Sequence, residues 1–192
     1  MVIKMNEHLE IEYKILLTEE IYEKIVSDYK SAITSIYSQT NFYFTHPLLS
    51  KHKMMLRIRE KGIHYELTLK RPYQGHNIET NVALTKQEKD DFINHLEMHN
   101  EIIEILDQYG INYQDLKQEY SLTTVRTDIQ LKEGVLSLDK NTYTNQMVDY
   151  ELEFEVNNQE TGYQKFLDII KPYHLNYSHN CESKFKRVLK NH

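Results

Sequence analysis

The sequence is poor in the residues that build disulfides, thiolate metal clusters and flexible linkers. Its 192 residues include one cysteine, no tryptophan, five glycines and three prolines. A lone cysteine, Cys181, excludes an internal disulfide framework and a zinc site built from cysteines. Because glycine and proline are scarce and no stretch has the composition of a linker, we expect a single domain over residues 1–192.

Long apolar runs and a positive net charge are also missing. No segment approaches the roughly 18 apolar residues of a membrane-spanning helix, and the N-terminal residues contain no apolar stretch typical of a secretory signal. We therefore expect a cytoplasmic protein that binds no membrane. The net charge of −6 argues against a nucleic-acid binder that follows the backbone through a basic surface. A polyanion would have to be held by a local basic site.

Alternation of apolar and polar residues predicts more strands than helices. The predicted strands are 8–16, 40–44, 54–60, 64–70, 121–131, 135–139 and 148–156. The predicted helices are 18–30, 85–109 with a bend or break near 98–100, 163–170 and 183–190. Because the strands follow one another through short turns, this order is typical of an antiparallel sheet with peripheral helices, which is an α+β fold.

The polar faces of the predicted strands carry an unusual density of charge. Period-two spacing puts Glu10, Glu12 and Lys14 on one face of the first strand, and Glu151 and Glu153 on one face of a late strand. Two interpretations compete. The sheet could face water and pair acidic with basic strands, or it could close into a barrel whose inward carboxylates bind hard divalent cations. In the barrel, arginine and lysine side chains would bind a polyanion such as a triphosphate.

The ordered set of charged segments resembles a known family. The segment EIEYK at residues 10–14 is similar to the N-terminal ExExK signature of the CYTH superfamily, the triphosphate tunnel metalloenzymes. The segments NFYFT, MLRIRE, YELTLKRP, SLTTVRTDIQL, VLSLDKNTY, VDYELEFEV and ESKFKRVL resemble successive later elements of that family. The likeness covers nearly the whole chain and is greatest to the small members found in Gram-positive bacteria.

The resemblance implies an eight-stranded antiparallel β-barrel with a charged tunnel, which hydrolyses a triphosphate with Mg²⁺ or Mn²⁺. The residues that match metal ligands are Glu10, Glu12, Asp139, Glu151 and Glu153. The residues that match triphosphate-binding cations are Lys14, Arg57, Arg59, Lys70, Arg126 and Lys184. Within these sets the chemical step is assigned to Lys14, Glu12 and Glu151. Roles for Glu155, Glu66 and Glu79 stay open.

The resulting prediction is a metal-dependent triphosphatase that acts on a small-molecule triphosphate, with inorganic tripolyphosphate as the first choice of substrate. Organic and nucleoside triphosphates are the other substrates considered. Two alternative functions stay open: a class IV type adenylyl cyclase that makes cyclic AMP from ATP, and a non-catalytic sensor of polyphosphate or nucleotide. The sequence is silent on the oligomeric state, so a homodimer also stays open.

Overall fold

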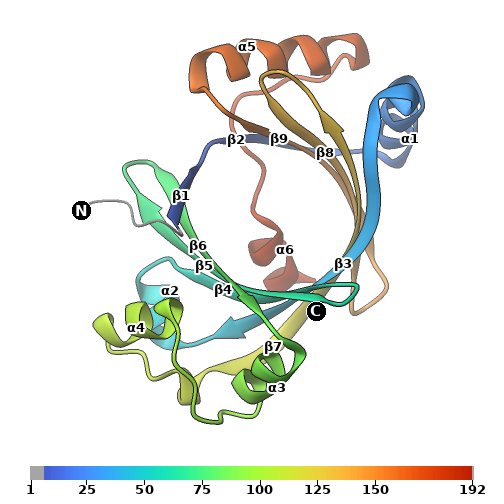
Figure 1. Ribbon diagram of the computed structural model, residues 1–192. Coiled ribbons are helices and arrows are strands. Elements are labelled where there is room, and N and C mark those ends of the chain that lie inside the picture. The colour runs from blue at the N-terminus through green and yellow to red at the C-terminus, as the bar shows by residue number, and fades with distance from the viewer. Residues whose placement is uncertain (1–6, 192) are drawn as a thin grey trace. The chain divides into compact units, whose positions relative to one another are not determined.

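The computed structural model describes residues 7–191 and consists of an antiparallel sheet with helices at its periphery (Figure 1). The strands are β1 (Glu7–Glu10), β2 (Glu12–Leu17), β3 (Ile33–Thr45), β4 (Met55–Lys61), β5 (His64–Tyr73), β6 (His76–Leu84), β7 (Lys117–Gln130), β8 (Gly134–Tyr143) and β9 (Val148–Val156). The α-helices are α1 (Glu19–Asp28), α2 (Pro47–Lys51), α3 (Lys86–Ile93), α4 (Glu101–Gln108), α5 (Gln159–Ile170) and α6 (Lys184–Lys190). None of the helices in this part of the chain has the length and apolar character needed to cross a bilayer.

The nine strands of the described chain form one sheet in the order β1-β6-β5-β4-β3-β7-β8-β9-β2. The pairs β1–β6, β3–β4, β4–β5, β5–β6, β8–β9 and β2–β9 are antiparallel. The first and last strands of this order are separated in the sequence by Ile11 alone, so the order is that of a barrel. The predicted α+β fold with an antiparallel barrel is therefore confirmed, with nine strands in place of eight.

Three differences from the predicted elements have local causes. The strand predicted over 8–16 is divided at Ile11, because its halves pair with different strands, β6 and β9. Strand β6 was not predicted, since Thr80 interrupts the apolar alternation of Ile78, Val82 and Leu84. The break predicted near 98–100 in the helix over 85–109 is confirmed, but it begins earlier than predicted, because α3 ends at Ile93 and α4 begins after its own N-cap, Asn100.

The chain divides into two compact units, which are described separately. The first unit consists of the residues up to Glu10 together with Gln39–Leu122. Its core lies between one face of the β4–β5–β6 sheet and the helices α2, α3 and α4. Leu56, Ile58, Leu67 and Leu69 from the strands pack there with Ile102, Ile103, Ile105 and Leu106 from α4. The opposite face of these strands carries the charged residues, as the alternation predicts.

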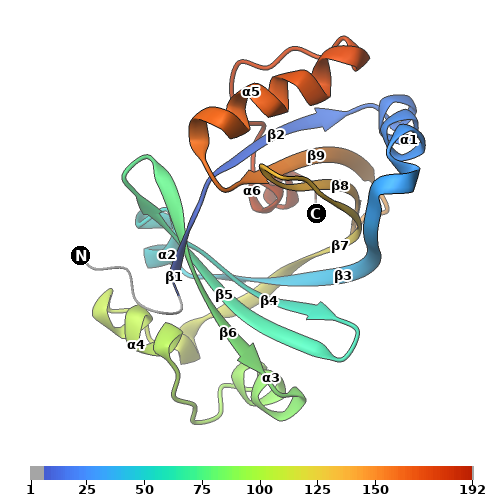
Figure 2. The same cartoon turned by 45° about the horizontal axis from the view of Figure 1, so that its top comes forward.

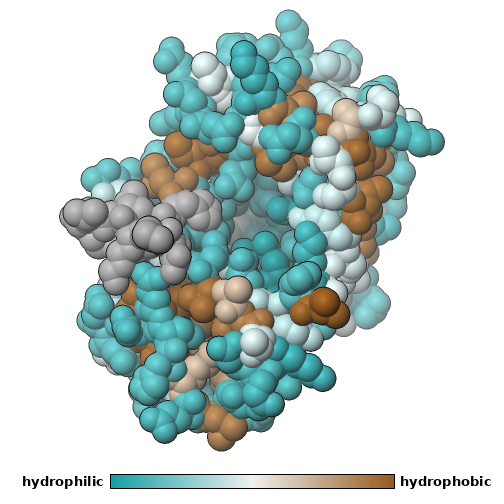
Figure 3. Space-filling view, viewed as in Figure 1, coloured by the Kyte–Doolittle hydropathy of each residue, from teal (hydrophilic) through white to brown (hydrophobic). Residues whose placement is uncertain are grey.

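The second unit consists of Ile11–Ser38 and the chain from Thr123 onward. Helix α5 lies along β2 and β9 in both ribbon views, and α6 lies on the other face of these strands (Figures 1 and 2). Phe166 of α5 packs with Tyr13, Leu152 and Phe154 in a buried core. The outward surface of α5 is mostly hydrophilic (Figure 3). The α5 side of the sheet is therefore apolar, and the α6 side is left for polar residues.

Truncation of this core should destabilise the second unit without touching the charged face. We expect Phe154→Ala to lower the free energy of unfolding by about 3–5 kcal/mol, because it removes a ring with no exposed surface and leaves a cavity. Urea denaturation followed by circular dichroism measures this. Val125→Ala is the matched control, since Val125 is 40% exposed and should change stability little. Equal losses in the two variants would contradict the placement of this core.

Candidate active site

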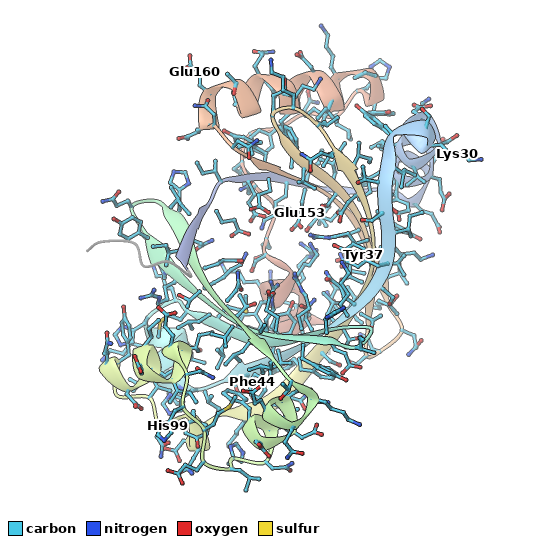
Figure 4. All side chains as sticks on the ribbon, viewed as in Figure 1. Lys30, Tyr37, Phe44, His99, Glu153 and Glu160 are labelled. Atoms are coloured by element: carbon cyan, nitrogen blue, oxygen red, sulfur yellow. The ribbon has the colours of Figure 1, made fainter. Side chains whose placement is uncertain are left out.

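Strands β8 and β9 place acidic side chains on the sheet face away from α5. Asp139 is the register partner of Glu151 in this antiparallel pair, and Leu152 between the two glutamates points into the core. Figure 4 shows Glu153 on the side of β9 away from α5, whereas Glu160 points outward from that helix. Alternation along β9 therefore separates Glu151 and Glu153 from the apolar core and brings them to Asp139.

The three carboxylates form one tight cluster. One oxygen from each of Asp139, Glu151 and Glu153 can be chosen so that all three atoms lie within 4.8 Å of one another. Asp139 and Glu151 have no exposed surface, and the side chain of Glu153 is 15% exposed. Carboxylate oxygens are the ligands that hard divalent cations prefer, so the donor set fits a hard divalent metal ion.

Arg126 of β7 binds two members of this cluster. Its Nε donates to Asp139 Oδ1 at 2.7 Å and its Nη2 to Asp139 Oδ2 at 2.6 Å, which is a bidentate fork. The same Nη2 also contacts Glu153 Oε2. The guanidinium therefore pairs with two carboxylates from two different strands.

Lys184 reaches all three carboxylates from the first turn of α6. Its Nζ lies 2.8 Å from Asp139 Oδ2 and 2.8 Å from Glu153 Oε1, and it also contacts Glu151 Oε1. Ser183 precedes it as the N-cap, whose hydroxyl accepts from the backbone N–H of Lys186. The helix start thus fixes the position from which the ammonium enters the cluster.

Lys14 and Glu12 extend the charged face onto β2. Lys14 is the register partner of Glu153, and its ammonium contacts the Glu12 carboxylate. Burial lowers the pKa of Lys14, but Glu12, Glu153 and Glu151 outweigh this effect and raise it above its ordinary value. Lys14 is therefore a protonated donor at neutral pH, and its pKa does not suit it to act as a base.

The backbone of β2 holds the segment that leads into α6. The Lys14 N–H donates to Asn180 Oδ1 at 2.8 Å, and Asn180 Nδ2 donates to the Glu12 carbonyl at 2.9 Å. The Cys181 N–H then donates to the Lys14 carbonyl at 3.2 Å. These bonds satisfy edge groups of β2 and anchor the residues just before Lys184.

The cluster divides its carboxylates by pKa. For Asp139, burial favours protonation, but Arg126 and Lys184 outweigh it and lower the pKa. For Glu153, burial acts in the same way, and Lys184 and Arg126 again hold the pKa well below its ordinary value. Burial raises the pKa of Glu151 to about 7, against the opposing effect of Lys184. Asp139 and Glu153 thus carry stable charges at neutral pH, and Glu151 titrates in that range.

A second charged group lies in the first unit, on the face of β4, β5 and β6 away from its core. Lys70 Nζ lies 2.7 Å from Glu10 Oε1 and 2.7 Å from Glu79 Oε1. Arg59 donates from Nε to Asn41 Oδ1 at 3.0 Å. Among the described residues, Arg57 Nε and Asn41 Nδ2 are buried without a hydrogen-bond partner.

The predicted site residues therefore fall into two sets. The structure brings seven of them together in the second unit: Glu12, Lys14, Arg126, Asp139, Glu151, Glu153 and Lys184. The other four lie in the first unit: Glu10, Arg57, Arg59 and Lys70. Of the residues left open, Glu79 pairs with Lys70 and Glu66 is the register partner of Arg59. Glu155 is exposed and lies outside the carboxylate cluster.

Sequence reasoning missed several polar residues beside these sets. Arg187 contacts Asp149 and Glu151 in the second unit, and Asn41 holds Arg59 in the first. The spacing of Lys184 and Arg187 was a usable signal, because residues three apart lie on the same side of a helix. Nothing in the sequence distinguished Asn41 from the other polar residues of β3.

Comparison with known proteins identifies the family. A family model described as the CYTH domain matches residues 8–179. The chain therefore belongs to the CYTH family, and the resemblance noted in the sequence is confirmed.

Individual relatives cover nearly the full chain. The Bacillus subtilis (strain 168) protein named "Putative triphosphatase YjbK" is 30% identical over 174 residues, which are 89% of this chain and 90% of that protein. A Bacillus halodurans crystal structure, described as a putative adenylate cyclase, has a TM-score of 0.87 and 31% identity, covering 95% of this chain and 98% of its own. A Hippeastrum structure, described as a putative adenylyl cyclase HpAC1 that reveals a dominant triphosphatase activity, has a TM-score of 0.79 at 21% identity, covering 95% of this chain and 96% of its own. This second structural likeness concerns the fold alone.

Removal of one cationic side chain should destabilise the folded protein, because a buried carboxylate then loses its ion pair. We expect Arg126→Met to lower the free energy of unfolding by about 3–5 kcal/mol, because Asp139 loses its bidentate partner while fully buried. Adding Asp139→Asn to this variant should recover part of the loss, since the unpaired charge is then gone. Urea denaturation of the single and double variants measures both effects. A single variant as stable as the unchanged protein would contradict the assignment.

The thiol beside the cluster should react slowly. Burial raises the pKa of Cys181 to about 12, with the neighbouring Glu151 adding to the rise. The folded state therefore favours the neutral thiol. As the pH rises above the ordinary thiol pKa, the unfolded chain loses this proton first, so the stabilisation that Cys181 contributes to the folded state is lost. We expect alkylation by iodoacetamide at about pH 8.5 to be about tenfold or more slower than in urea-unfolded protein. Equal rates would contradict the burial of this thiol.

Proposed function

We propose that this protein hydrolyses a small-molecule triphosphate with a divalent metal ion, and that inorganic tripolyphosphate is its first-choice substrate. The observation that carries the proposal is the cluster of Asp139, Glu151 and Glu153, whose carboxylates are interleaved with the cations Arg126 and Lys184. The triphosphatase name of the Bacillus subtilis relative supports the same function. Such a reaction needs carboxylates that can hold a metal and cations that can hold phosphate, and the cluster contains side chains of both kinds.

The carboxylate set would hold the metal. Asp139, Glu151 and Glu153 supply oxygen donors, and Glu12 and Glu10 are further predicted ligands. A bound Mg²⁺ or Mn²⁺ would supply positive charge to the phosphate oxygens and lower the pKa of a water nucleophile. The predicted role of Glu12 and Glu151 in the chemical step depends on this site.

The cations of the second unit would bind and orient the triphosphate. Arg126 presents a planar fork that matches two phosphate oxygens, and Lys184 presents a point charge. Lys14 is held protonated by its acidic neighbours, so we assign it to donate hydrogen bonds to the phosphoryl oxygens that gain charge during the reaction. Its role in the step is therefore electrostatic.

The cationic set of the first unit would hold phosphate oxygens by the same chemistry. Arg57 Nε and Asn41 Nδ2 are buried donors without a protein acceptor among the described residues, which suits them to an anionic ligand. Arg59 is oriented by Asn41, and Lys70 is paired with acidic residues. Arg57, Arg59 and Lys70 remain predicted phosphate ligands.

Two other functions give distinct products. The adenylate cyclase description of the Bacillus halodurans neighbour favours a cyclase, which would release pyrophosphate and cyclic AMP from ATP. A sensor would bind a triphosphate without turnover. The same assay separates all three functions.

The first experiment measures phosphate release from tripolyphosphate, ATP, GTP and thiamine triphosphate with Mg²⁺, Mn²⁺ or EDTA. We expect release that depends on the metal and is lost in EDTA, with tripolyphosphate fastest. Glu12→Gln should reduce turnover by about 10²-fold or more while the circular dichroism spectrum is kept, because it removes a predicted metal ligand. Glu160→Gln on the outward side of α5 is the matched control and should keep full activity (Figure 4).

The outcomes discriminate sharply. If the protein forms cyclic AMP from ATP, the proposed triphosphatase function is wrong and the cyclase function is correct. If the protein binds a triphosphate tightly but releases neither phosphate nor cyclic AMP, the proposed triphosphatase function is wrong and the sensor function is correct. Full activity in Glu12→Gln would overturn the assignment of that residue to the metal.

A further inference from the structure

Arg187 lies behind the carboxylate cluster and is held from several directions. It is 5% exposed and sits one helical turn after Lys184 on α6. Its Nε donates to Asp149 Oδ2 at 2.9 Å and to the Tyr143 hydroxyl at 3.2 Å. Its Nη1 contacts both the Glu182 carbonyl and Glu151 Oε2. The guanidinium is therefore a fixed group, because its partners come from two strands and from the segment before α6.

Asp149, one partner of Arg187, is itself fixed by buried groups. Asp149 Oδ1 accepts from Asn141 Nδ2 at 2.9 Å, and Asn141 Oδ1 accepts from the Thr124 hydroxyl at 2.7 Å. Thr124 and Asn141 have no exposed surface. A continuous chain of hydrogen bonds thus runs from the buried Thr124 of β7 through Asn141 of β8 and the partly exposed Asp149 of β9 to Arg187, which contacts Glu151.

The two oxygens of Glu151 have different partners as a result. Oε1 contacts Lys184, which also binds Asp139 and Glu153 and so belongs to the cluster. Oε2 contacts Arg187 and accepts from the Cys181 thiol at 3.5 Å, and neither of these residues contacts Asp139 or Glu153. One oxygen of Glu151 is therefore directed into the cluster, and the other is retained outside it.

We propose that Arg187 is a positioning residue that makes Glu151 a one-oxygen ligand and thereby favours small divalent cations over Ca²⁺. Calcium takes six to eight oxygens and commonly binds a carboxylate through both, whereas Mg²⁺ requires a compact octahedral set of single oxygens. A guanidinium that occupies Oε2 denies Glu151 the two-oxygen mode. This inference rests on the proposed function, because it requires the cluster to bind a metal.

A binding experiment tests the proposal without an activity assay. The purified protein is titrated with Mn²⁺ and followed by electron paramagnetic resonance, and bound Mn²⁺ is then displaced with Mg²⁺ or Ca²⁺. For the unchanged protein we expect Mg²⁺ to displace Mn²⁺ at lower concentration than Ca²⁺ does. The measured quantity is the concentration of Ca²⁺ that displaces half of the Mn²⁺, divided by the corresponding concentration of Mg²⁺. In Arg187→Met we expect this ratio to fall by about tenfold, the size of effect typical of groups that orient metal ligands.

Further variants separate positioning from a merely structural role. Arg187→Lys keeps the charge, but one ammonium lacks the fork that reaches Asp149 and Glu151 together, so it should shift the ratio in the same direction by a smaller factor. Asp149→Asn weakens the anchor of Arg187 and should also shift it. Lys190→Met is the control on the same helix, because Lys190 is 62% exposed and contacts Glu182 alone among the described residues. It should leave the ratio unchanged.

Each outcome decides the question. If the unchanged protein binds no Mn²⁺, Mg²⁺ or Ca²⁺, the proposed function and this inference are both overturned. If it binds Mn²⁺ and the folded variants keep its ratio of Mg²⁺ to Ca²⁺, the proposed function stands and the role of Arg187 is overturned. If Arg187→Met does not fold by circular dichroism, Arg187→Lys and Asp149→Asn decide by the same ratio.

Discussion

The second unit depends on the neutralisation of buried acidic groups. Two ionised carboxylates about 4.8 Å apart repel by roughly 3–4 kcal/mol at an effective dielectric constant of about 20, and the cluster contains three such pairs when Glu151 is ionised. That repulsion is comparable to the whole stability of a typical domain, about 5–15 kcal/mol. The cluster is therefore compatible with folding only because each of its six oxygens contacts Arg126, Lys184 or Arg187.

The fold supplies these cations from two separate parts of the chain. Arg126 lies on β7 and reaches Asp139 through ordinary sheet neighbours. Lys184 and Arg187 come from α6, whose approach is fixed by Asn180 on the backbone of β2. The apolar contact of α5 with the other face of the sheet keeps the glutamates of β9 turned toward α6. Core packing and charge pairing thus both follow from the alternation of apolar and acidic side chains along β9.

Alternation made much of this arrangement predictable. It placed Glu151 and Glu153 on one face, and family resemblance supplied Asp139, Arg126 and Lys184. Strand β6 escaped prediction because Thr80 occupies a core-facing position, and a period-two pattern has no means to recognise a buried threonine. Arg187 escaped because its partners Asp149 and Glu151 are distant in sequence, and such pairings are set by tertiary packing. The break between α3 and α4 was visible as a change of phase in the apolar stripe, but its length was not.

The cations of the second unit are of two kinds, and the difference bears on the proposed function. Within the described chain, the ion pairs of Arg126 and Lys184 are all with cluster carboxylates, so those two cations have no competing acidic anchor. Arg187 is tied to Asp149 and Tyr143 as well. A phosphate chain that enters a metal-loaded cluster could recruit Arg126 and Lys184 without breaking any other ion pair, whereas recruiting Arg187 would leave Asp149 without its cation. This difference is the reason why we propose substrate binding for Arg126 and Lys184, and positioning of a metal ligand for Arg187.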